Sequence, residues 1–432
     1  MPILRINQLE LQQIGPFGDL TLNFPEKPAG MEDKAEIHIL TGENGTGKST
    51  MLEIMTLIGI GDKHFEPTIN KLRRSINART ILSISPDCNL GFFIAPLKEQ
   101  ATIFKETTNY LNIANKYVRP YQEFPNLPFG IAFFAYSGHR RFNSTTIIGI
   151  KEIENHPFEN ALDFQQSINP ANILQWIANN KAGQAFAHVG GDTQELDKLR
   201  QIMNKLENTI SEIIQKSVRF QVKTKPYNVV VEVDGEELEF NQLPDGLKSI
   251  ISWIADLLMR MDRVKWENDT PVFERNFILF LDEIEVHMHP VWQRKILPVV
   301  QKLFPNAQIF ISTHSPFVVG SVDGARIHKL VKPNGDSKLA EGYPKLSEDG
   351  NSFRYWLDEV FDVSAEFGIG AENQLKEFYA LRDEVLKSND ENLNKKLLSK
   401  GRELAEQSTE LHQIIEMELR QLNRRKSLSL SI

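Results

Sequence analysis

A short glycine-rich segment has the residue types and spacing of a phosphate-binding loop. GENGTGKS, from Gly42 to Ser49, matches G-x-x-x-x-G-K-[ST] and lies between an apolar strand candidate and an amphipathic helix candidate. Glycines let successive backbone N–H groups converge on phosphates, and the helix presents its positive dipole end to them. We expect Lys48 to reach the β- and γ-phosphates and Ser49 to ligate Mg²⁺; the alternative is an ordinary glycine turn. The expected nucleotide-binding residues are Gly42, Glu43, Asn44, Gly45, Thr46, Gly47, Lys48, Ser49 and Thr50.

Two adjacent carboxylates follow a second apolar run. Residues 277–281, FILFL, have the pattern of a strand buried on both faces, and the run ends in Asp282-Glu283. A carboxylate at this place can hold the Mg²⁺ shell, and a second one can act as general base on an attacking water. We therefore expect Asp282 to bind the metal and Glu283 to be catalytic. The alternative is a capping pair between a strand and a helix.

Histidines supply the remaining candidate chemistry. His314 follows an apolar strand candidate at 307–312, where it could contact a γ-phosphate, and we expect it to be catalytic. His287 and His289 have the spacing of a metal pair, but no third ligand cluster is near in sequence. We favour a structural or dimer-contact role for this pair.

Secondary-structure patterns place these residues in an α/β fold. Residues 277–281, a helix beginning near Pro290 and residues 307–312 have the order of a βαβ unit. A hairpin turn is expected at Asp234-Gly235, because both residues tolerate a positive φ. Apolar residues recur at helical spacing over three further stretches, at 192–216, 246–263 and 372–425.

Composition narrows the class of protein. The chain has 432 residues, a formal net charge of -8 and one cysteine, Cys88, which excludes a disulfide scaffold and favours the cytoplasm. We find no run of 18 apolar residues and expect no membrane contact. The net charge does not exclude DNA binding by a local basic surface. Its candidate basic clusters are Lys71 to Arg74, His139 to Arg141, Arg260 with Arg263 and Lys265, and Arg424 to Lys426, and the alternative is solvated charge balanced by acids.

The order of four motifs resembles the ATP-binding-cassette (ABC) type of ATPase head. These motifs are GENGTGKST at 42–50, LPDGLKS at 243–249, FILFLDE at 277–283 and STHSP at 312–316. LPDGLKS stands where the family has its signature sequence, which closes over the γ-phosphate bound by another subunit. The resemblance implies ATP and Mg²⁺ as ligands and a homodimer with composite sites. The residues expected to face the partner's nucleotide are Pro244, Asp245, Gly246 and Lys248. The family's signature serine is Pro244 here, and the glutamine that usually joins the Mg²⁺ shell has no evident counterpart.

A narrower resemblance covers roughly residues 1–330. IGPFGDLTLNF, FFAYSGHRRF, DEIEVHMHPVWQRKILP and FPNAQIFISTHSPFVV look like soluble bacterial ATPases of the SMC-like group. That group includes the overcoming-lysogenisation-defect (OLD) nucleases and the Septu and retron-associated defence ATPases. The resemblance implies a mixed β-sheet with helices and an antiparallel β-subdomain. It also implies a discontinuous head at 1–60 and 228–330, an inserted helical lobe at 61–227, and a C-terminal helical region at 331–432 for oligomer or partner contacts.

The expected function is that of an ATPase scaffold, dimeric or of higher order, that controls a separate effector in bacterial antiviral defence. An HNH-type nuclease is the expected effector. One alternative is a DNA-repair or recombination ATPase that binds DNA directly. Another is an OLD-like ATPase-nuclease, although residues 331–432 contain no Asp-x-Asp motif. The last is a transporter ATPase subunit, which would usually show a serine-containing signature.

Overall fold

The computed structural model divides the chain into two compact units, Met1–Phe361 and Asp362–Ile432. The structure describes residues 5–56, 72, 74, 75, 78–85, 88–94, 101–105, 132–138, 149–164, 168–266, 269–388, 390–426 and 428–432. Lys71, Arg73 and the cluster His139 to Arg141 lie outside the described residues. Among the described helices, none is long and apolar enough to cross a membrane.

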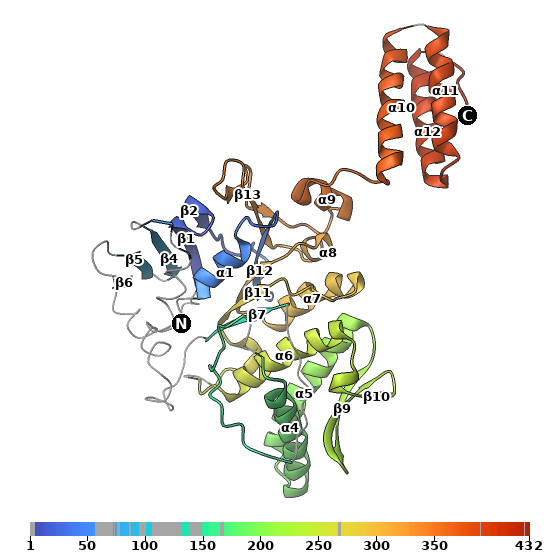
Figure 1. Ribbon diagram of the computed structural model, residues 1–432. Helices are drawn as coiled ribbons and strands as arrows, with labels where there is room; N and C mark the ends of the chain where they lie inside the picture. The colour runs from blue at the N-terminus through green and yellow to red at the C-terminus, as the bar shows by residue number, and fades with distance from the viewer. Residues whose placement is uncertain are drawn as a thin grey trace. The chain divides into compact units, whose positions relative to one another are not determined.

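The first unit combines strands and helices, and the second unit is helical (Figure 1). The strands are β1 (Arg5–Ile14), β2 (Phe17–Asn23), β3 (Glu36–Gly42), β4 (Arg79–Ser85), β5 (Cys88–Ile94), β6 (Ala101–Lys105), β7 (Ala132–Ser137), β8 (Val218–Thr224), β9 (Tyr227–Val233), β10 (Glu236–Glu239), β11 (Phe277–Asp282), β12 (Ala307–Ser312), β13 (Arg326–Val331), β14 (Lys338–Leu339) and β15 (Lys345–Leu346). The helices are α1 (Lys48–Thr56), α4 (Pro170–Gly190), α5 (Thr193–Ile214), α6 (Asp245–Arg263), α7 (Pro290–Leu303), α8 (Pro316–Val319), α9 (Phe353–Phe361), α10 (Ile369–Lys387), α11 (Glu391–Ala405) and α12 (Thr409–Lys426).

The main sheet brings the predicted site residues together at the carboxyl ends of its parallel strands. Its described strands have the order β14-β13-β3-β12-β11-β7, with β15 also paired to β13. The strands β13, β3, β12, β11 and β7 run parallel. In register, Asp282 lies opposite Ser312 on one side and Ser137 on the other, and Ser312 lies opposite Leu40. The carboxyl ends of β3, β12, β11 and β7 therefore meet, and we call this place the carboxyl edge.

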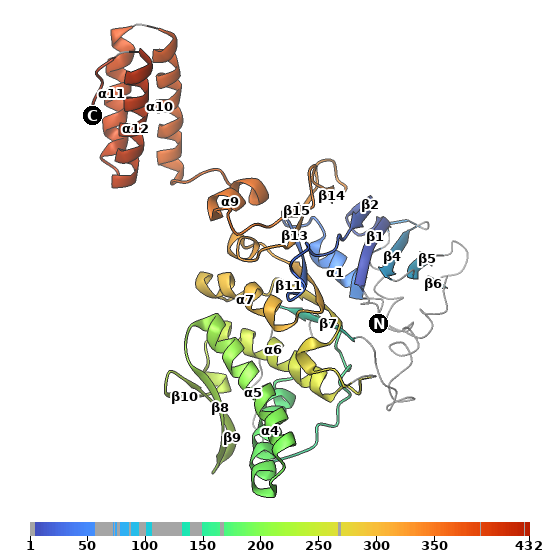
Figure 2. The same cartoon turned by 180° about the vertical axis from the view of Figure 1, so that it is seen from behind.

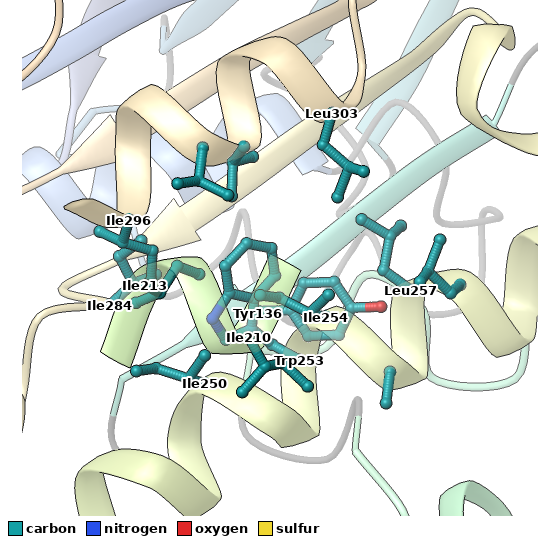
Figure 3. Close-up of a cluster of buried hydrophobic side chains, with 14 of the residues drawn as sticks. Tyr136, Ile210, Ile213, Ile250, Trp253, Ile254, Leu257, Ile284, Ile296 and Leu303 are labelled. Carbon is teal, nitrogen blue, oxygen red and sulfur yellow. The ribbon is translucent and has the colours of Figure 1, made fainter. Parts of the chain in front are cut away.

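Both faces of the main sheet are buried, as the uninterrupted apolar run at 277–281 predicts. Alternate residues of β11 join different cores: Leu279 and Leu281 join one, and Ile278 and Phe280 join the other. The first core is covered by α4, α5, α6 and α7, and Figure 3 shows part of it around Tyr136 and Trp253. The second core lies against α1 and the antiparallel strands β1 and β2. Figures 1 and 2 show these layers on opposite sides of the main sheet.

Two smaller sheets complete the first unit. One is antiparallel, with the order β2-β1-β4-β5-β6, and the other has the order β10-β9-β8. The hairpin predicted at Asp234-Gly235 joins β9 to β10, and both residues have a positive φ, of 51° and 87°. The helices beside it begin at side-chain caps, because Asn169 accepts from the N–H of Ala171 and Asp192 from that of Glu195.

The second unit consists of α10, α11 and α12, which lie side by side as an antiparallel bundle (Figures 1 and 2). The bundle has a core of its own, which includes Phe378, Leu397 and Ile415. The helical periodicity at 372–425 is thus confirmed, and it divides among these three helices.

The domain boundaries differ from those expected in two places. Strand β7, placed in the inserted lobe at 61–227, pairs with β11 in the main sheet, and β4 pairs with β1. The first unit also continues past 330 to Phe361, because β14 and β15 pair with β13 and Trp356 of α9 is buried. Sheet pairing between distant segments decides both boundaries, and a change in composition along the chain does not report it.

Candidate nucleotide-binding site

The glycine loop lies between β3 and α1, as its sequence predicts. Gly42, Gly45 and Gly47 all have a positive φ, of 136°, 81° and 94°, a backbone conformation that residues with a side chain rarely adopt. The Thr46 hydroxyl donates to the carbonyl oxygen of Glu43 at 2.8 Å and closes the turn. Helix α1 begins at Lys48, so its first N–H groups face the loop. This arrangement of strand, loop and helix end fits a phosphate group.

Lys48 is held inside the loop. Its Nζ donates to the carbonyl oxygens of Gly42 and Glu43, at 3.0 Å each, and the residue is 5% exposed. Burial lowers the pKa of Lys48, and the carboxylates of Glu283, Asp282 and Glu285 oppose that shift. The ammonium group therefore lies among carbonyl oxygens of the loop, where phosphate oxygens could replace them.

Ser49 and Asp282 come together across the carboxyl edge. The hydroxyl of Ser49 donates to Asp282 Oδ1 at 2.9 Å, and the hydroxyl of Ser312 donates to the same oxygen. A serine hydroxyl and a carboxylate are ligands that suit Mg²⁺, which usually completes its shell with waters and phosphates. Among the described residues, no group of three or more His, Cys, Asp and Glu side chains could hold a metal ion by itself. The donor set thus fits Mg²⁺ shared with a nucleotide.

Glu283 is fixed by its backbone at the end of β11. Its N–H donates to the carbonyl oxygen and to the hydroxyl of Ser312, both at 3.1 Å, and its φ is 49°. Gly138, directly after β7, lies so close that a Cβ there would be 1.8 Å from the Glu283 carbonyl oxygen. The carboxylate itself stays 26% exposed. Glu283 is therefore rigidly placed and open to water, as a general base must be.

His314 lies beside Glu283. Its Nε2 is 3.7 Å from Glu283 Oε1, and the side chain is 36% exposed. Burial, with a contribution from Lys48, lowers the pKa of His314, while Glu283 opposes the shift. The imidazole is thus favoured in its neutral form, which offers one donor and one acceptor.

The segment with the signature position lies elsewhere on the same unit. Helix α6 begins at Asp245, and Pro244 provides no side-chain cap. Lys248 Nζ is 3.5 Å from Asp245 Oδ1, and a Cβ on Gly246 would be 2.6 Å from the carbonyl oxygen of His287. Among the described residues, no hydrogen bond or ion pair joins 244–248 to the loop at 42–50. Within one chain, this segment does not complete the loop's site.

His289 has a structural role. It precedes α7, and its Nδ1 accepts from the N–H of Val291 at 3.3 Å, so it caps that helix. His287 has a left-handed backbone with a φ of 67°, and its carbonyl oxygen meets Gly246. The pair therefore shapes the connection between β11 and α7.

Two arginines of one basic cluster have hydrogen-bond partners within the protein. Arg260 is 5% exposed and binds Asp256 at 2.5 Å and the carbonyl oxygens of Pro157 and Glu159. Arg263 donates to the carbonyl oxygens of Ile153 and Asn155, at 2.6 Å each. These arginines hold the segment at 149–164, and DNA contact by this cluster stays a prediction.

Two parts of the site were not predicted. Ser137 and Gly138 reach the carboxyl edge at the end of β7, beside Asp282. The signal was the apolar run AFFAY followed by Ser-Gly, which repeats the pattern of FILFL followed by Asp-Glu. Glu285 also belongs here, because its carboxylate binds the loop that carries His314.

Comparison with known proteins now places the chain in a family. The family described as "AAA domain, putative AbiEii toxin, Type IV TA system" matches residues 37–320. The chain belongs to this AAA domain family. A second family described as "AAA domain" matches residues 4–63. The glycine loop and the mixed α/β sheet of the first unit agree with this membership.

Similar proteins include two components of bacterial systems. The Septu protein PtuA of Bacillus thuringiensis is 24% identical over 373 residues, which cover 83% of this chain and 84% of that protein. The retron Ec83 probable ATPase of Escherichia coli is 30% identical over 144 residues, which cover 33% of this chain and 25% of that protein. Among solved structures, the SMC head domain from Thermotoga maritima aligns with a TM-score of 0.44 and 13% identity over 78% of this chain and 98% of that one.

Proposed function

We propose that the protein binds and hydrolyses ATP at a composite site between two copies of the chain. The observation that carries this proposal is the convergence of Lys48, Ser49, Asp282, Glu283 and His314 at the carboxyl edge. The glycine loop holds the phosphates, and Lys48 exchanges loop carbonyls for phosphate oxygens. Ser49 and Asp282 would hold Mg²⁺, which would supply positive charge beside the phosphates.

Glu283 and His314 have different roles in hydrolysis. Glu283 accepts a proton from the attacking water, because its side chain is partly exposed while its backbone is fixed. His314 donates a hydrogen bond to the γ-phosphate and so distinguishes ATP from ADP. The segment 244–248 of the second copy covers the γ-phosphate through backbone N–H groups near Asp245 and Gly246 and through Lys248, in place of the signature serine.

Closure of the dimer gives the site a regulatory use. ATP binds the closed dimer more tightly than the open one, so binding and hydrolysis shift the equilibrium between the two states. We propose that this equilibrium controls a separate effector in antiviral defence, in the cytoplasm, and that the effector is an HNH-type nuclease. The likeness to Septu PtuA and to a retron ATPase supports the defence role.

Mixed dimers test the composite site. Lys48→Ala removes the phosphate contact of one site, and Lys248→Glu places negative charge where the partner's γ-phosphate would lie. Each variant alone should lose ATPase activity, and an equal mixture should regain about a quarter of the wild-type activity, because about half of the dimers are mixed and each mixed dimer keeps one of its two sites. If both variants are folded and the mixture stays inactive, the composite site is refuted.

The effector has its own experiment. The untagged protein is purified from its native cell, and the proteins that accompany it are identified by mass spectrometry. We expect a nuclease of the HNH type. Recovery of a membrane transporter subunit instead would contradict the effector assignment without affecting the ATPase site.

A further inference from the structure

A second glutamate in the connection from β11 to α7 binds the loop that carries His314. Glu285 is 8% exposed, and its Oε1 accepts from the Thr313 hydroxyl at 2.7 Å and from the N–H of His314 at 2.9 Å. Thr313 Oγ1 in turn accepts from the N–H of Ser315 at 3.0 Å. One carboxylate oxygen thus fixes the backbone of the loop on both sides of the His314 Cα atom.

The same loop is held a second time from α7. The hydroxyl of Ser315 donates to Gln293 Oε1 at 2.6 Å, and Gln293 Nε2 donates to the carbonyl oxygen of Met288 at 2.9 Å. These bonds and those of Glu285 close a ring that joins the connection at 283–289 to the loop at 313–315. His314 is a member of this ring, and Glu283 precedes its first member, Glu285, by two residues.

The imidazole of His314 depends on this ring for its position. Among the described side chains, Glu283 alone lies within ion-pair reach of it, at 3.7 Å. The ring of bonds acts on the His314 backbone, so it sets where the side chain begins and which way it points. A loop shift of about 1 Å would be enough to spoil catalysis, since misplacement on that scale costs roughly 100-fold in rate.

The surroundings of Glu285 indicate that its side chain serves as a hydrogen-bond acceptor. Burial raises the pKa of its carboxyl group, and Oε2 has no hydrogen-bond partner among the described atoms. Burying an unsatisfied oxygen is unfavourable, so the two bonds to Oε1 must offset that cost. An apolar residue here would leave the hydroxyl of Thr313 and the N–H of His314 without their acceptor.

We propose that Glu285 is a positioning residue of the hydrolytic site, which acts through the backbone of Thr313 and His314 to hold the imidazole against Glu283 and the γ-phosphate. The proposal rests on the ATPase function proposed above. Glu285 makes no hydrogen bond to the glycine loop among the described residues, so its removal should lower kcat and leave KM for ATP nearly unchanged.

Steady-state ATPase kinetics of Glu285→Ala and Glu285→Gln test this role. The alanine variant should lose roughly 10- to 100-fold in kcat, with KM within about threefold of wild type. The glutamine variant keeps an acceptor oxygen in the same place and should stay within about threefold in both constants. Equal defects in the two variants, or no defect in the alanine variant, would overturn the proposal.

A double-mutant cycle separates positioning from general structural damage. In a His314→Ala background, Glu285→Ala should change kcat by less than about twofold, because the group it positions is gone. Multiplicative effects of the two changes would show that Glu285 acts by another route. If Glu285→Ala does not fold, Thr313→Val replaces it in the same cycle, since it removes one of the two donors to Oε1.

The two proposals fail in different ways. A folded wild-type protein without ATPase activity would overturn the proposed function and this inference with it. Active wild type with an unaffected Glu285→Ala variant would overturn the inference and leave the ATPase function standing.

Discussion

Two polar clusters lie at opposite ends of the same strands. They differ in which groups serve as hydrogen-bond partners of their side chains. At its carboxyl end β3 leads into the glycine loop, and at its amino end it carries Glu36 and His38. In the same way β12 carries Gln308 near one end and Ser312 at the other. Both clusters combine carboxylates, histidine and cationic groups, so residue type alone does not distinguish them.

The amino-end cluster, formed by Arg5, Glu36, His38, Gln308 and His328, uses its own members as partners. Glu36 Oε1 accepts from Arg5 at 2.7 Å and from Gln308 at 2.6 Å, and it lies 2.8 Å from His38 Nε2. His38 Nδ1 lies 3.2 Å from His328 Nε2. Burial alone would raise the pKa of Glu36, but hydrogen bonds from His38 and Arg5 lower it to about 2. This cluster joins β1 to the main sheet, and its side chains are largely buried.

The carboxyl edge is built in the opposite way. Glu283 and His314 are 26% and 36% exposed, and Lys48 is held by carbonyl oxygens of its own loop. We interpret the buried, largely paired cluster as structural, with His328 Nδ1 as its one nitrogen that lacks a hydrogen-bond partner among the described atoms. We interpret a cluster held by the backbone, with its charged side chains partly exposed, as prepared for a ligand.

Among the variants that test this contrast, Lys48→Ala is expected to have the largest effect, a loss of ATP affinity. ATP affinity should fall by on the order of 100-fold, because a charge-assisted contact to phosphate is lost, and the thermal midpoint should change little. Titration with a fluorescent ATP analogue measures the change. Lys27→Ala is the matched control, since Lys27 also binds carbonyl oxygens, those of Lys34 and Pro305, and should leave affinity unchanged. Retained affinity in Lys48→Ala would remove the loop from nucleotide binding.

Glu36→Gln should have the reverse pattern. Loss of this charge leaves Arg5 without its buried partner, and we expect the free energy of unfolding to fall by about 3 kcal/mol. ATP affinity of the folded protein should not change. Urea unfolding monitored by circular dichroism gives the first quantity, and the ATP-analogue titration gives the second. A weakened ATP affinity at full stability would erase the distinction between the two ends.

Lowering the pH should reduce the free energy of unfolding in two stages, both of which arise from the amino-end cluster. Burial lowers the pKa values of His38 and His328, so below pH 6.5 the unfolded chain takes up protons that the folded chain does not, and stability falls. Glu36 adds a further loss from pH 4.5 down toward its folded value of about 2. Urea unfolding at a series of pH values measures both stages, and Glu36→Gln should lack the second. Stability that stays constant from pH 6.5 to 5 would contradict the first.

Removal of the second unit should have the smallest effect. Both polar clusters lie in the first unit, and the bundle of α10, α11 and α12 has its own core. A chain ending at Phe361 should therefore bind ATP within about twofold of the full chain. Nucleotide titration of the shortened protein checks this, with the full chain as control. A large loss of affinity would mean that the second unit contributes to the site.

The sequence predicted those parts of the site that depend on neighbouring residues. The glycine loop, Asp282, Glu283 and His314 all follow apolar strands, and the order of residues places them at the ends of those strands. Their proximity followed from the rule that parallel strands align their carboxyl ends.

What sequence reasoning missed depends on pairing between distant segments. The bond from Gln308 to Ile6 joins residues 302 positions apart, and the contact of His38 with His328 spans 290. The bond from Glu285 to His314 spans 29 positions, across α7. No local pattern marks such partners, which is also why β7 was assigned to the wrong domain.

The most direct test of the account is the ATPase rate of Glu283→Gln, measured together with ATP affinity and assembly size. We expect kcat to fall by roughly 100- to 10,000-fold, as for loss of a general base, with ATP affinity retained. Light scattering should then show a closed dimer that accumulates with ATP and Mg²⁺. Unchanged turnover in this variant would contradict the assignment of Glu283 as the base and, with it, the distinction drawn between the two ends of the sheet.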